Sequence, residues 1–218
     1  LRNRGHPHPP IHLWGHDHEG AYRKLPTAEP ELSYMLLITE EGITVWQHFV
    51  LVFGATSSVW GYNRFGDALV GIGRLTLATL CFHYVDDYGG VEESRTAESA
   101  FRGFKDLNAK LGAQMKPSKE QPPSTQHIIQ GVLVSIADGH AVVCATANRK
   151  AKLTSQVSNI LTEGCLTPQQ AGVLAGKFGF VASSLFGQLA RPVLHAIYLR
   201  QQAASLHRDI QALTPALR

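Results

Sequence analysis

The chain has 218 residues, of which 44% are hydrophobic, 17% charged and 8% aromatic, and its formal net charge is +3. This apolar content suffices for one sizeable core and excludes a largely disordered chain, because disordered chains are poor in hydrophobic residues. The composition also excludes a collagen, a coiled coil and a disulfide scaffold. The three cysteines, Cys81, Cys144 and Cys165, are odd in number and widely spaced. We therefore expect reduced thiols and an intracellular protein.

The sequence carries no sign of a signal peptide or a membrane span. It begins at Leu1 without a charged segment that leads into an apolar one, which a secretory signal would need. The longest stretch without Lys, Arg, Asp or Glu runs from Gly42 to Asn63 and contains several polar residues. We therefore expect no membrane partner. We also expect a further segment N-terminal to Leu1 in the natural protein.

Charge is distributed unevenly along the chain. Residues 148–218 hold eight Lys or Arg and two acids, which gives 8 − 2 = +6, and residues 1–147 carry the remaining 12 − 15 = −3. A basic C-terminal third beside an acidic body is typical of a protein that binds a polyanion such as nucleic acid. A solvated helical surface is the alternative interpretation of the same charges.

The first half of the chain predicts an irregular lead-in, a β-hairpin and a long helix. Residues 1–12 are rich in His, Pro and Arg and are expected to be irregular. Residues 32–39 and 43–53 are rich in β-branched and aromatic residues and flank a short Glu-Glu-Gly segment, which predicts a hairpin. From 57 to 80 apolar residues recur mostly every three to four positions, which predicts a helix.

The middle of the chain predicts a second hairpin and an amphipathic helix. Residues 81–85 and 88–91 are expected to be strands joined by an acidic turn, Asp86-Asp87. Residues 95–112 carry apolar residues at helical spacing. The segment 117–125, rich in Pro and Ser, is expected to be a loop.

After this loop the sequence predicts a third hairpin and then helices only. Residues 127–136 and 140–145 would form the hairpin, turned by Asp138-Gly139. Three helices are expected after it, over 147–163, 168–182 and 190–208. Thr167 before Pro168 is a favourable start for the second of them. The fold class is therefore α+β, followed by a basic all-helical region.

The adjacent carboxylates Asp86 and Asp87 are the strongest chemical signal. Two such groups repel each other at close range, and a cation relieves that repulsion. Oxygen ligands suit Mg²⁺ or Mn²⁺. An ordinary β-turn that uses Asp for its turn propensity is the alternative.

Further motifs accompany this turn in a fixed order. Tyr84-Val85-Asp86-Asp87 resembles the Y-x-D-D motif of reverse transcriptases. Upstream, Asp17 followed five residues later by Tyr22 resembles the first palm motif of that family, and Phe53-Gly54 resembles the segment that opens its long palm helix. Downstream, Leu111-Gly112 with Lys119 resembles the fourth motif.

Two more segments extend the resemblance into the basic region. Ile129-Gln130-Gly131-Val132 resembles the primer-grip hairpin, and Leu174-Ala175-Gly176-Lys177 resembles the thumb of retroelement enzymes. The resemblance covers about residues 13–200. It implies a lead-in over 1–12, an antiparallel-sheet palm with packed helices over 13–145, and a helical thumb or connection-like region over 146–218.

The resemblance implies an RNA-directed DNA polymerase that adds deoxynucleotides to a primer 3′-hydroxyl. Its partners would be an RNA template, a DNA primer, nucleoside triphosphates and a fingers segment N-terminal to Leu1. The cofactor would be two Mg²⁺ or Mn²⁺ ions. The implied metal ligands are Asp17, Asp86 and Asp87.

Other residues receive roles by the same resemblance. Tyr22 would lie beneath the sugar and exclude a 2′-hydroxyl, and Lys119 would protonate or stabilise the leaving pyrophosphate, with Lys116 as a competitor. The residues expected to contact substrate are Tyr22, Phe53, Gly54, Tyr84 and Gly131. The basic helices after 147 would grip the duplex backbone.

The chain departs from the family pattern at several positions. Val52 stands where Pro is usual, Gln130 stands before Gly131 where Leu is usual, and His16 and His18 flank Asp17 where apolar residues are usual. A catalytically inactive palm that binds nucleic acid or a partner protein is therefore one alternative.

A metal-binding module is the other alternative. Five histidines lie within thirteen residues, namely His6, His8, His12, His16 and His18. Imidazoles at this density bind Zn²⁺, Ni²⁺ or Cu²⁺. The prolines between them oppose a helix that would align their side chains.

Overall fold

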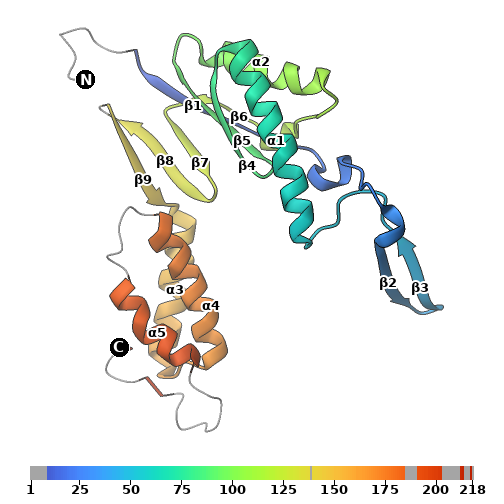
Figure 1. Ribbon diagram of the computed structural model, residues 1–218. Coiled ribbons are helices and arrows are strands. Elements are labelled where there is room, and N and C mark those ends of the chain that lie inside the picture. Colours follow the sequence, from blue (N-terminus) through green and yellow to red (C-terminus); the bar gives the residue numbers. More distant parts are fainter. Residues whose placement is uncertain (1–8, 138, 185–190, 203–211, 214–216, 218) are drawn as a thin grey trace. The chain divides into compact units, whose positions relative to one another are not determined.

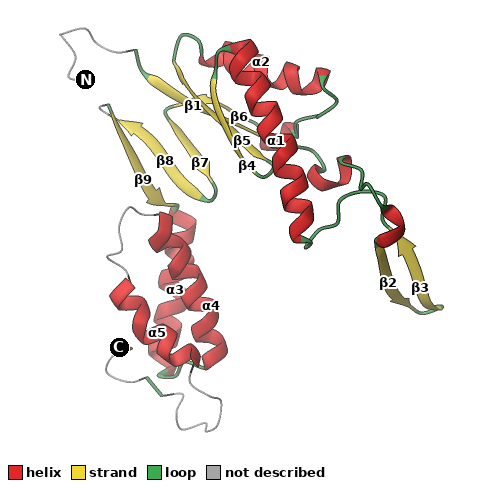
Figure 2. Cartoon of the chain, in the orientation of Figure 1, coloured by secondary structure: helices red, strands yellow, loops and turns green. Residues whose placement is uncertain are grey.

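The structure, a computed structural model, describes residues 9–137, 139–184, 191–202, 212–213 and 217. The chain forms two compact units, Leu1–His127 (unit 1) and Ile128–Arg218 (unit 2) (Figure 1). Both are mixtures of helices and antiparallel strands, with five α-helices among the described residues (Figure 2). None of the helices in this described part is long and apolar enough to cross a membrane.

Unit 1 is built on a four-stranded sheet with the order β4-β5-β1-β6. Its strands are β1 (Ile11–Asp17), β4 (Leu80–Tyr84), β5 (Asp87–Glu93) and β6 (Gln121–Ser124). β5 pairs antiparallel with both β4 and β1, and β6 pairs antiparallel with β1. The hairpin that the sequence predicts around the acidic turn is therefore confirmed.

Two sequence predictions for this unit are wrong in detail. The segment 117–125, expected to be a loop, contains a short 3₁₀ helix (Pro117–Lys119) and strand β6. β6 is an edge strand, where prolines are tolerated because one side needs no ladder hydrogen bond. β1 begins at Ile11, within the lead-in that the sequence marked as irregular, while residues 1–8 lie outside the described part of the chain.

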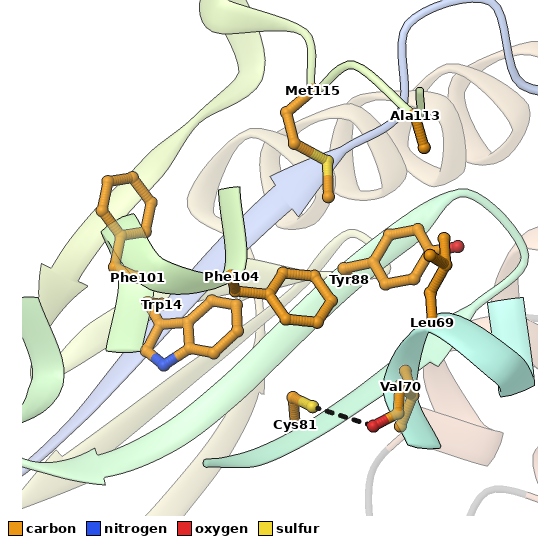
Figure 3. Packing of buried hydrophobic residues seen from close by; sticks show 9 residues of the cluster. All are labelled: Trp14, Leu69, Val70, Cys81, Tyr88, Phe101, Phe104, Ala113 and Met115. Carbon is orange, nitrogen blue, oxygen red and sulfur yellow. Dashed lines mark hydrogen bonds between the residues drawn. The ribbon is translucent and has the colours of Figure 1, made fainter. Parts of the chain in front are cut away.

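Two helices pack on the sheet of unit 1, as the sequence predicts. They are α1 (Thr56–Leu77) and α2 (Ala97–Lys110). Side chains alternate along each strand, so even-numbered β1 residues such as Trp14 join Tyr88 of β5 and Cys81 of β4 on the helix side. Figure 3 shows this core, which consists of Trp14, Leu69, Val70, Cys81, Tyr88, Phe101, Phe104, Ala113 and Met115.

Unit 1 also contains a separate two-stranded sheet, whose strands follow β1 and precede α1 in the sequence. It comprises β2 (Tyr34–Thr39) and β3 (Gly42–Gln47), preceded by the 3₁₀ helices Ala21–Lys24 and Pro30–Leu32. The predicted hairpin is confirmed, but its second strand ends at Gln47 rather than at residue 53. The chain beyond it forms a bridge between Val50 and Pro26 instead.

Unit 2 combines a three-stranded sheet with three helices. The strands are β7 (Gln126–Ile129), which begins in unit 1, β8 (Val132–Ala137) and β9 (His140–Ala145). The helices are α3 (Ala147–Glu163), α4 (Pro168–Ser184) and α5 (Arg191–Gln202). The helices have their own core, which includes Ile160, Leu174 and Leu194.

The sequence predictions for unit 2 hold with one correction, apart from the Asp138-Gly139 turn, in which residue 138 lies outside the described part. The strand expected over 127–136 is broken at Gln130 and Gly131, whose φ angles are 50° and 70°. Thr167 and Gln170 exchange backbone-to-side-chain hydrogen bonds, which confirms the predicted helix start. The predicted third helix is present as α5, while residues 203–208 lie outside the described part.

The close contact between Gly90 and Trp14 generates a stability prediction. A Cβ at residue 90 would overlap the Trp14 indole, whereas a Cβ at Gly71, within α1, would meet no atom within 4 Å. We expect Gly90→Ala to lower the free energy of unfolding by about 2 kcal/mol through overpacking. The control Gly71→Ala should raise it by about 0.5 kcal/mol through helix propensity. Urea unfolding measures both, and an unchanged Gly90→Ala midpoint would contradict the packing argument.

Candidate active site and basic pocket

Two acidic side chains meet where β1 and β5 pair. Asp17, the last residue of β1, lies directly opposite Asp87, the first residue of β5. Both point to the side of the sheet away from α1 and α2, because their neighbours His16 and Tyr88 point toward the helices. The carboxyl group of Asp17 lies close enough to that of Asp87 to raise its pKa.

Asp86 lies in the two-residue turn that joins β4 to β5. Tyr84 pairs with Asp87, so Val85 and Asp86 form the loop of the hairpin. Val85 has a φ of 54°, as at the first position of a type II′ turn, where Gly is usual. The backbone N–H of His18 donates to the Asp86 carbonyl at 3.1 Å. The turn is thereby tied to the end of β1.

Lys119 supplies a positive charge beside Asp17, Asp86 and Asp87, which together form the acidic group. Its Nζ lies 2.6 Å from Oδ2 of Asp17, whose side chain is only 6% exposed. The pKa of Lys119 is raised, first by this hydrogen bond and then by the charges of Asp17, Asp87 and Asp86. Lys116, the competitor in the sequence, contacts Asp17 through its backbone N–H.

The neighbouring carboxylates act on Asp87. Asp87 is open to solvent, yet its pKa is raised by partial desolvation, by its hydrogen bond to Asp17 and by the nearby charges of Asp86 and Asp17. Among the described residues, no three His, Cys, Asp or Glu side chains are gathered closely enough to hold a metal ion. Asp17 and Asp87 therefore form a pair, on which Asp86 acts through its charge.

The aromatic residues of two sequence motifs come together beside the acidic group. Tyr22 is buried, and its ring packs edge-on against Tyr62 and Phe53, with ring centres 5.4 and 5.0 Å away. Burial, with the Asp86 charge as the smaller cause, raises the pKa of Tyr22. Phe53 is 61% exposed and Gly54 has a φ of 90°.

The remaining predicted residues are Tyr84, which pairs with Asp87 in the β4–β5 ladder, and Gly131. Tyr84 of β4 is 64% exposed. Gly131 belongs to unit 2, between β7 and β8, where it is described below.

A buried polar network supports Asp17 from the helix side. His18 accepts a hydrogen bond from the Tyr62 hydroxyl through Nδ1 at 2.5 Å and donates to the Asn108 side-chain oxygen through Nε2 at 3.2 Å. This pattern requires a neutral ring, and burial lowers the pKa of His18 accordingly. Tyr62 and Asn108 were not singled out from the sequence, because their spacing on α1 and α2 is that of core residues.

The histidines of the proposed metal module do not form a cluster in the part of the chain that the structure describes. His16 stacks on Phe101 with ring centres 4.3 Å apart and donates to its carbonyl, and its pKa is lowered by burial. His18 belongs to the network above. His6 and His8 lie outside the described residues.

Unit 2 contains a basic pocket of about 640 Å³ between its sheet and helices. Three cations line it, and no Asp or Glu is among the described residues that do so. The lining consists of Ile128, Gly131, Thr146, Asn148, Arg149, Lys152, Leu153, Gln156, Gly176, Lys177 and Phe180.

Arg149 is held in this pocket in an unusual way. Its guanidinium lies 4.2 Å from the centre of the Phe180 ring, and its Nη1 is buried without a hydrogen-bond partner. A Cβ at Gly131 would lie 2.7 Å from Nη2 of Arg149, so a larger residue there would displace the guanidinium. The pocket therefore combines an unsatisfied donor with two further cations, which favours an anionic ligand.

Comparisons with known proteins agree with this architecture. No family model matches the sequence, and no curated protein matches it. Three solved structures of the foamy viral protease-reverse transcriptase are similar to this chain. The structure with an RNA/DNA hybrid has a TM-score of 0.60 at 15% identity. Two structures with double-stranded DNA have TM-scores of 0.58 and 0.57 at 17% and 18% identity. Each covers 86% of this chain, which spans 23%, 30% and 36% of those chains respectively. The chain therefore has a reverse transcriptase-like fold.

The raised pKa of Asp87 predicts a pH-dependent stability. A carboxyl whose pKa is higher in the folded state destabilises the fold as pH rises above its ordinary value of 3.8. We expect Asp87→Asn to be more stable than the wild type at neutral pH, by about 0.5 kcal/mol after discounting for solvent exposure. In urea unfolding at pH values from about 4 to 7, the free energy of unfolding should decline less steeply with pH for the variant than for the wild type. The control is Asp106→Asn on α2, and a variant that is less stable at every pH would contradict the prediction.

Proposed function

We propose that the chain is the palm and thumb region of an RNA-directed DNA polymerase, which transfers deoxynucleotides onto a primer 3′-hydroxyl. The observation that carries the proposal is the meeting of Asp17 and Asp87, with Asp86 beside them, at one edge of a reverse transcriptase-like sheet. The similar structures hold an RNA/DNA hybrid or double-stranded DNA. The proposed partners of this chain are therefore a template, a primer and nucleoside triphosphates.

The donor set fits divalent cations. Asp17, Asp87 and Asp86 are hard oxygen ligands that repel one another, and this repulsion favours a cation such as Mg²⁺ or Mn²⁺. When bound, such ions would supply the activation of the primer hydroxyl and the stabilisation of charge on the leaving pyrophosphate. The three carboxylates are not gathered around one point among the described residues, so at least one side chain must turn before all three can bind one ion.

The protein's own residues have separate tasks in this proposal. Lys119 holds a proton on Nζ at the edge of the acidic group, and it delivers that proton to the leaving pyrophosphate. Tyr22, fixed between Tyr62 and Phe53, closes the space that a ribose 2′-hydroxyl would need. The cations of the basic pocket in unit 2 bind backbone phosphates of the nucleic acid.

A second candidate function is nucleic-acid binding without catalysis. It is favoured by the lack, among the described residues, of three possible metal ligands gathered together, and by Lys119, whose ammonium neutralises Asp17. Both candidates require the basic pocket, and only the first requires cation binding by the acidic group.

Cation binding distinguishes the two candidates. We expect the chain to bind Mn²⁺ and to lose at least about tenfold in affinity in Asp17→Asn and in Asp86→Asn, because each removes a charged ligand. Isothermal titration with MnCl₂ measures the affinity, and Asp106→Asn is the control. Primer extension on an RNA template should fall by about a thousandfold in Asp86→Asn. Unchanged Mn²⁺ affinity in both variants would leave only the binding function.

The basic pocket predicts a salt-dependent interaction. We expect the double variant Lys152→Gln/Lys177→Gln to bind an RNA/DNA hybrid about tenfold more weakly, and its salt-dependence slope to decrease by about 2, because two phosphate contacts are lost. Fluorescence anisotropy at several salt concentrations measures both quantities. The control is Lys110→Gln at the end of α2 in unit 1. An unchanged slope would show that the pocket binds no phosphate.

A further inference from the structure

Two side-chain contacts link α3 to α4 at the basic pocket of unit 2, and each of them uses a cation. The guanidinium of Arg149 lies over the ring of Phe180, and Nζ of Lys177 donates to Oε1 of Gln156 at 2.8 Å. Both partners are uncharged. The ion pairs among the described residues all lie in unit 1. No described carboxylate therefore neutralises the positive charge of this pocket.

The guanidinium of Arg149 is held in a fixed position. Its Cζ lies 4.2 Å from the centre of the Phe180 ring, and the backbone at Gly131 is so near that a Cβ there would lie 2.7 Å from Nη2. Its Nη1 is buried and has no hydrogen-bond partner. A fixed planar guanidinium with an unpaired donor is suited to the oxygens of a phosphate or a carboxylate.

The apolar part of the pocket is suited to an organic group rather than to a bare anion. Leu153, Phe180 and Ile128 line it and are 9%, 40% and 52% exposed. The volume of about 640 Å³ lies in the range of roughly 300–1,000 Å³ that is typical of pockets for small organic ligands. A lone phosphate would leave the apolar side chains facing water. The pocket therefore favours an anion that carries an apolar or aromatic body.

Gly176 of α4 leaves part of this space open. It lines the pocket, and a Cβ at this position would meet no atom within 4 Å. It lies within a helix and has no positive φ, so a larger residue there causes no backbone strain. A long side chain at residue 176 would therefore take up space in the pocket without changing its charge.

We propose that the basic pocket binds a single nucleotide, base included. Its cations hold the phosphate, and its apolar side chains contact the base and the sugar. The inference rests on the proposed function, which identifies the organic anion as a nucleotide, and it deepens that function. A base that is stacked and paired within a duplex cannot enter such a pocket. The ligand is therefore a free nucleotide or an unpaired nucleotide at the end of a strand, which share the same phosphate, sugar and base.

Isothermal titration of the full chain without divalent cations tests this with deoxyadenosine monophosphate (dAMP), deoxyadenosine and inorganic phosphate. We expect dAMP to bind at least about tenfold more tightly than either of the others, because only dAMP has both the charge and the base. Equal affinities for dAMP and inorganic phosphate would reduce the pocket to a phosphate site and overturn the proposal. This comparison requires no substitution, so a variant that fails to fold does not remove the test.

Gly176→Leu separates a site inside the pocket from a charged surface. It fills the pocket and keeps every cation, so the affinity for dAMP should fall at least about tenfold through steric overlap. The control is Gly71→Leu on α1, where a Cβ likewise meets no atom within 4 Å. Unchanged dAMP affinity in Gly176→Leu would place the ligand outside the pocket and overturn the proposal.

A matched pair of lysines on α3 tests the charge. Lys152 lines the pocket, whereas Lys150 on the same helix does not. We expect Lys152→Gln to weaken dAMP binding about threefold and Lys150→Gln to leave it unchanged. Equal losses in the two variants would show that net charge, rather than the pocket, binds the phosphate, and the proposal would be wrong.

Nucleic-acid ends identify the source of the nucleotide. Fluorescence anisotropy compares a blunt RNA/DNA hybrid with one that ends in a single unpaired adenosine. Tighter binding of the second hybrid, lost in Gly176→Leu, would support the pocket with a strand end as its ligand. Equal binding of the two hybrids, with dAMP still bound, would support it with a free nucleotide as its ligand.

This test is separate from that of the acidic group. Titration with Mn²⁺ examines Asp17 and Asp86 in unit 1, whereas titration with dAMP in the absence of divalent cations examines unit 2. Binding of dAMP as expected, without Mn²⁺ affinity, would support the pocket and refute the polymerase. Binding of Mn²⁺ without the expected preference for dAMP would refute the nucleotide pocket alone.

Discussion

The register between β1 and β5 determines where every group of the candidate site lies. Asp17 pairs with Asp87, and side chains alternate between the two faces along β1. Even-numbered residues of β1, such as Trp14, therefore enter the core, and the two carboxylates lie on the opposite side of the sheet. A slip by one residue would exchange the two faces and place the acids among Phe101 and Phe104. The Trp14 indole favours the observed register, since it occupies the space that a side chain at residue 90 would need.

The two sides of this sheet differ in how they treat charge. On the helix side, burial keeps His16 and His18 neutral, and the His18–Tyr62–Asn108 network satisfies polar atoms without introducing an ion. On the other side three carboxylates share one ammonium group, that of Lys119. A neutral network suits a buried position, because an unpaired charge there would cost free energy of folding.

Local patterns in the sequence predict most of the fold, and long-range contacts explain what they miss. Apolar spacing identifies α1 to α4, and the Asp86–Asp87 turn marks its own hairpin. The segment 117–125 was expected to be a loop because a proline-rich edge strand has no alternating pattern, and it is a strand only because β1 lies beside it. The break at Gln130 likewise depends on a positive φ that its residue type does not favour.

The candidate site was predictable only to the level of its motifs. A family resemblance singled out Asp17, Asp86, Asp87 and Lys119, and their roles stay predictions. The ion pair between Lys119 and Asp17 joins residues 102 positions apart, a separation over which a single sequence carries no signal of contact.

The β2–β3 hairpin has a consequence for the behaviour of the chain in solution. Its side chains are apolar on both faces, and Leu36, Ile38 and Ile43 are 68%, 87% and 71% exposed. As a sheet of only two strands it has two open edges whose backbone groups can pair with another chain. Such segments seed cross-β stacking. We therefore expect association through this hairpin, rather than unfolding, to limit the concentration of the chain in solution, and a charged residue in place of Ile38 to raise that limit.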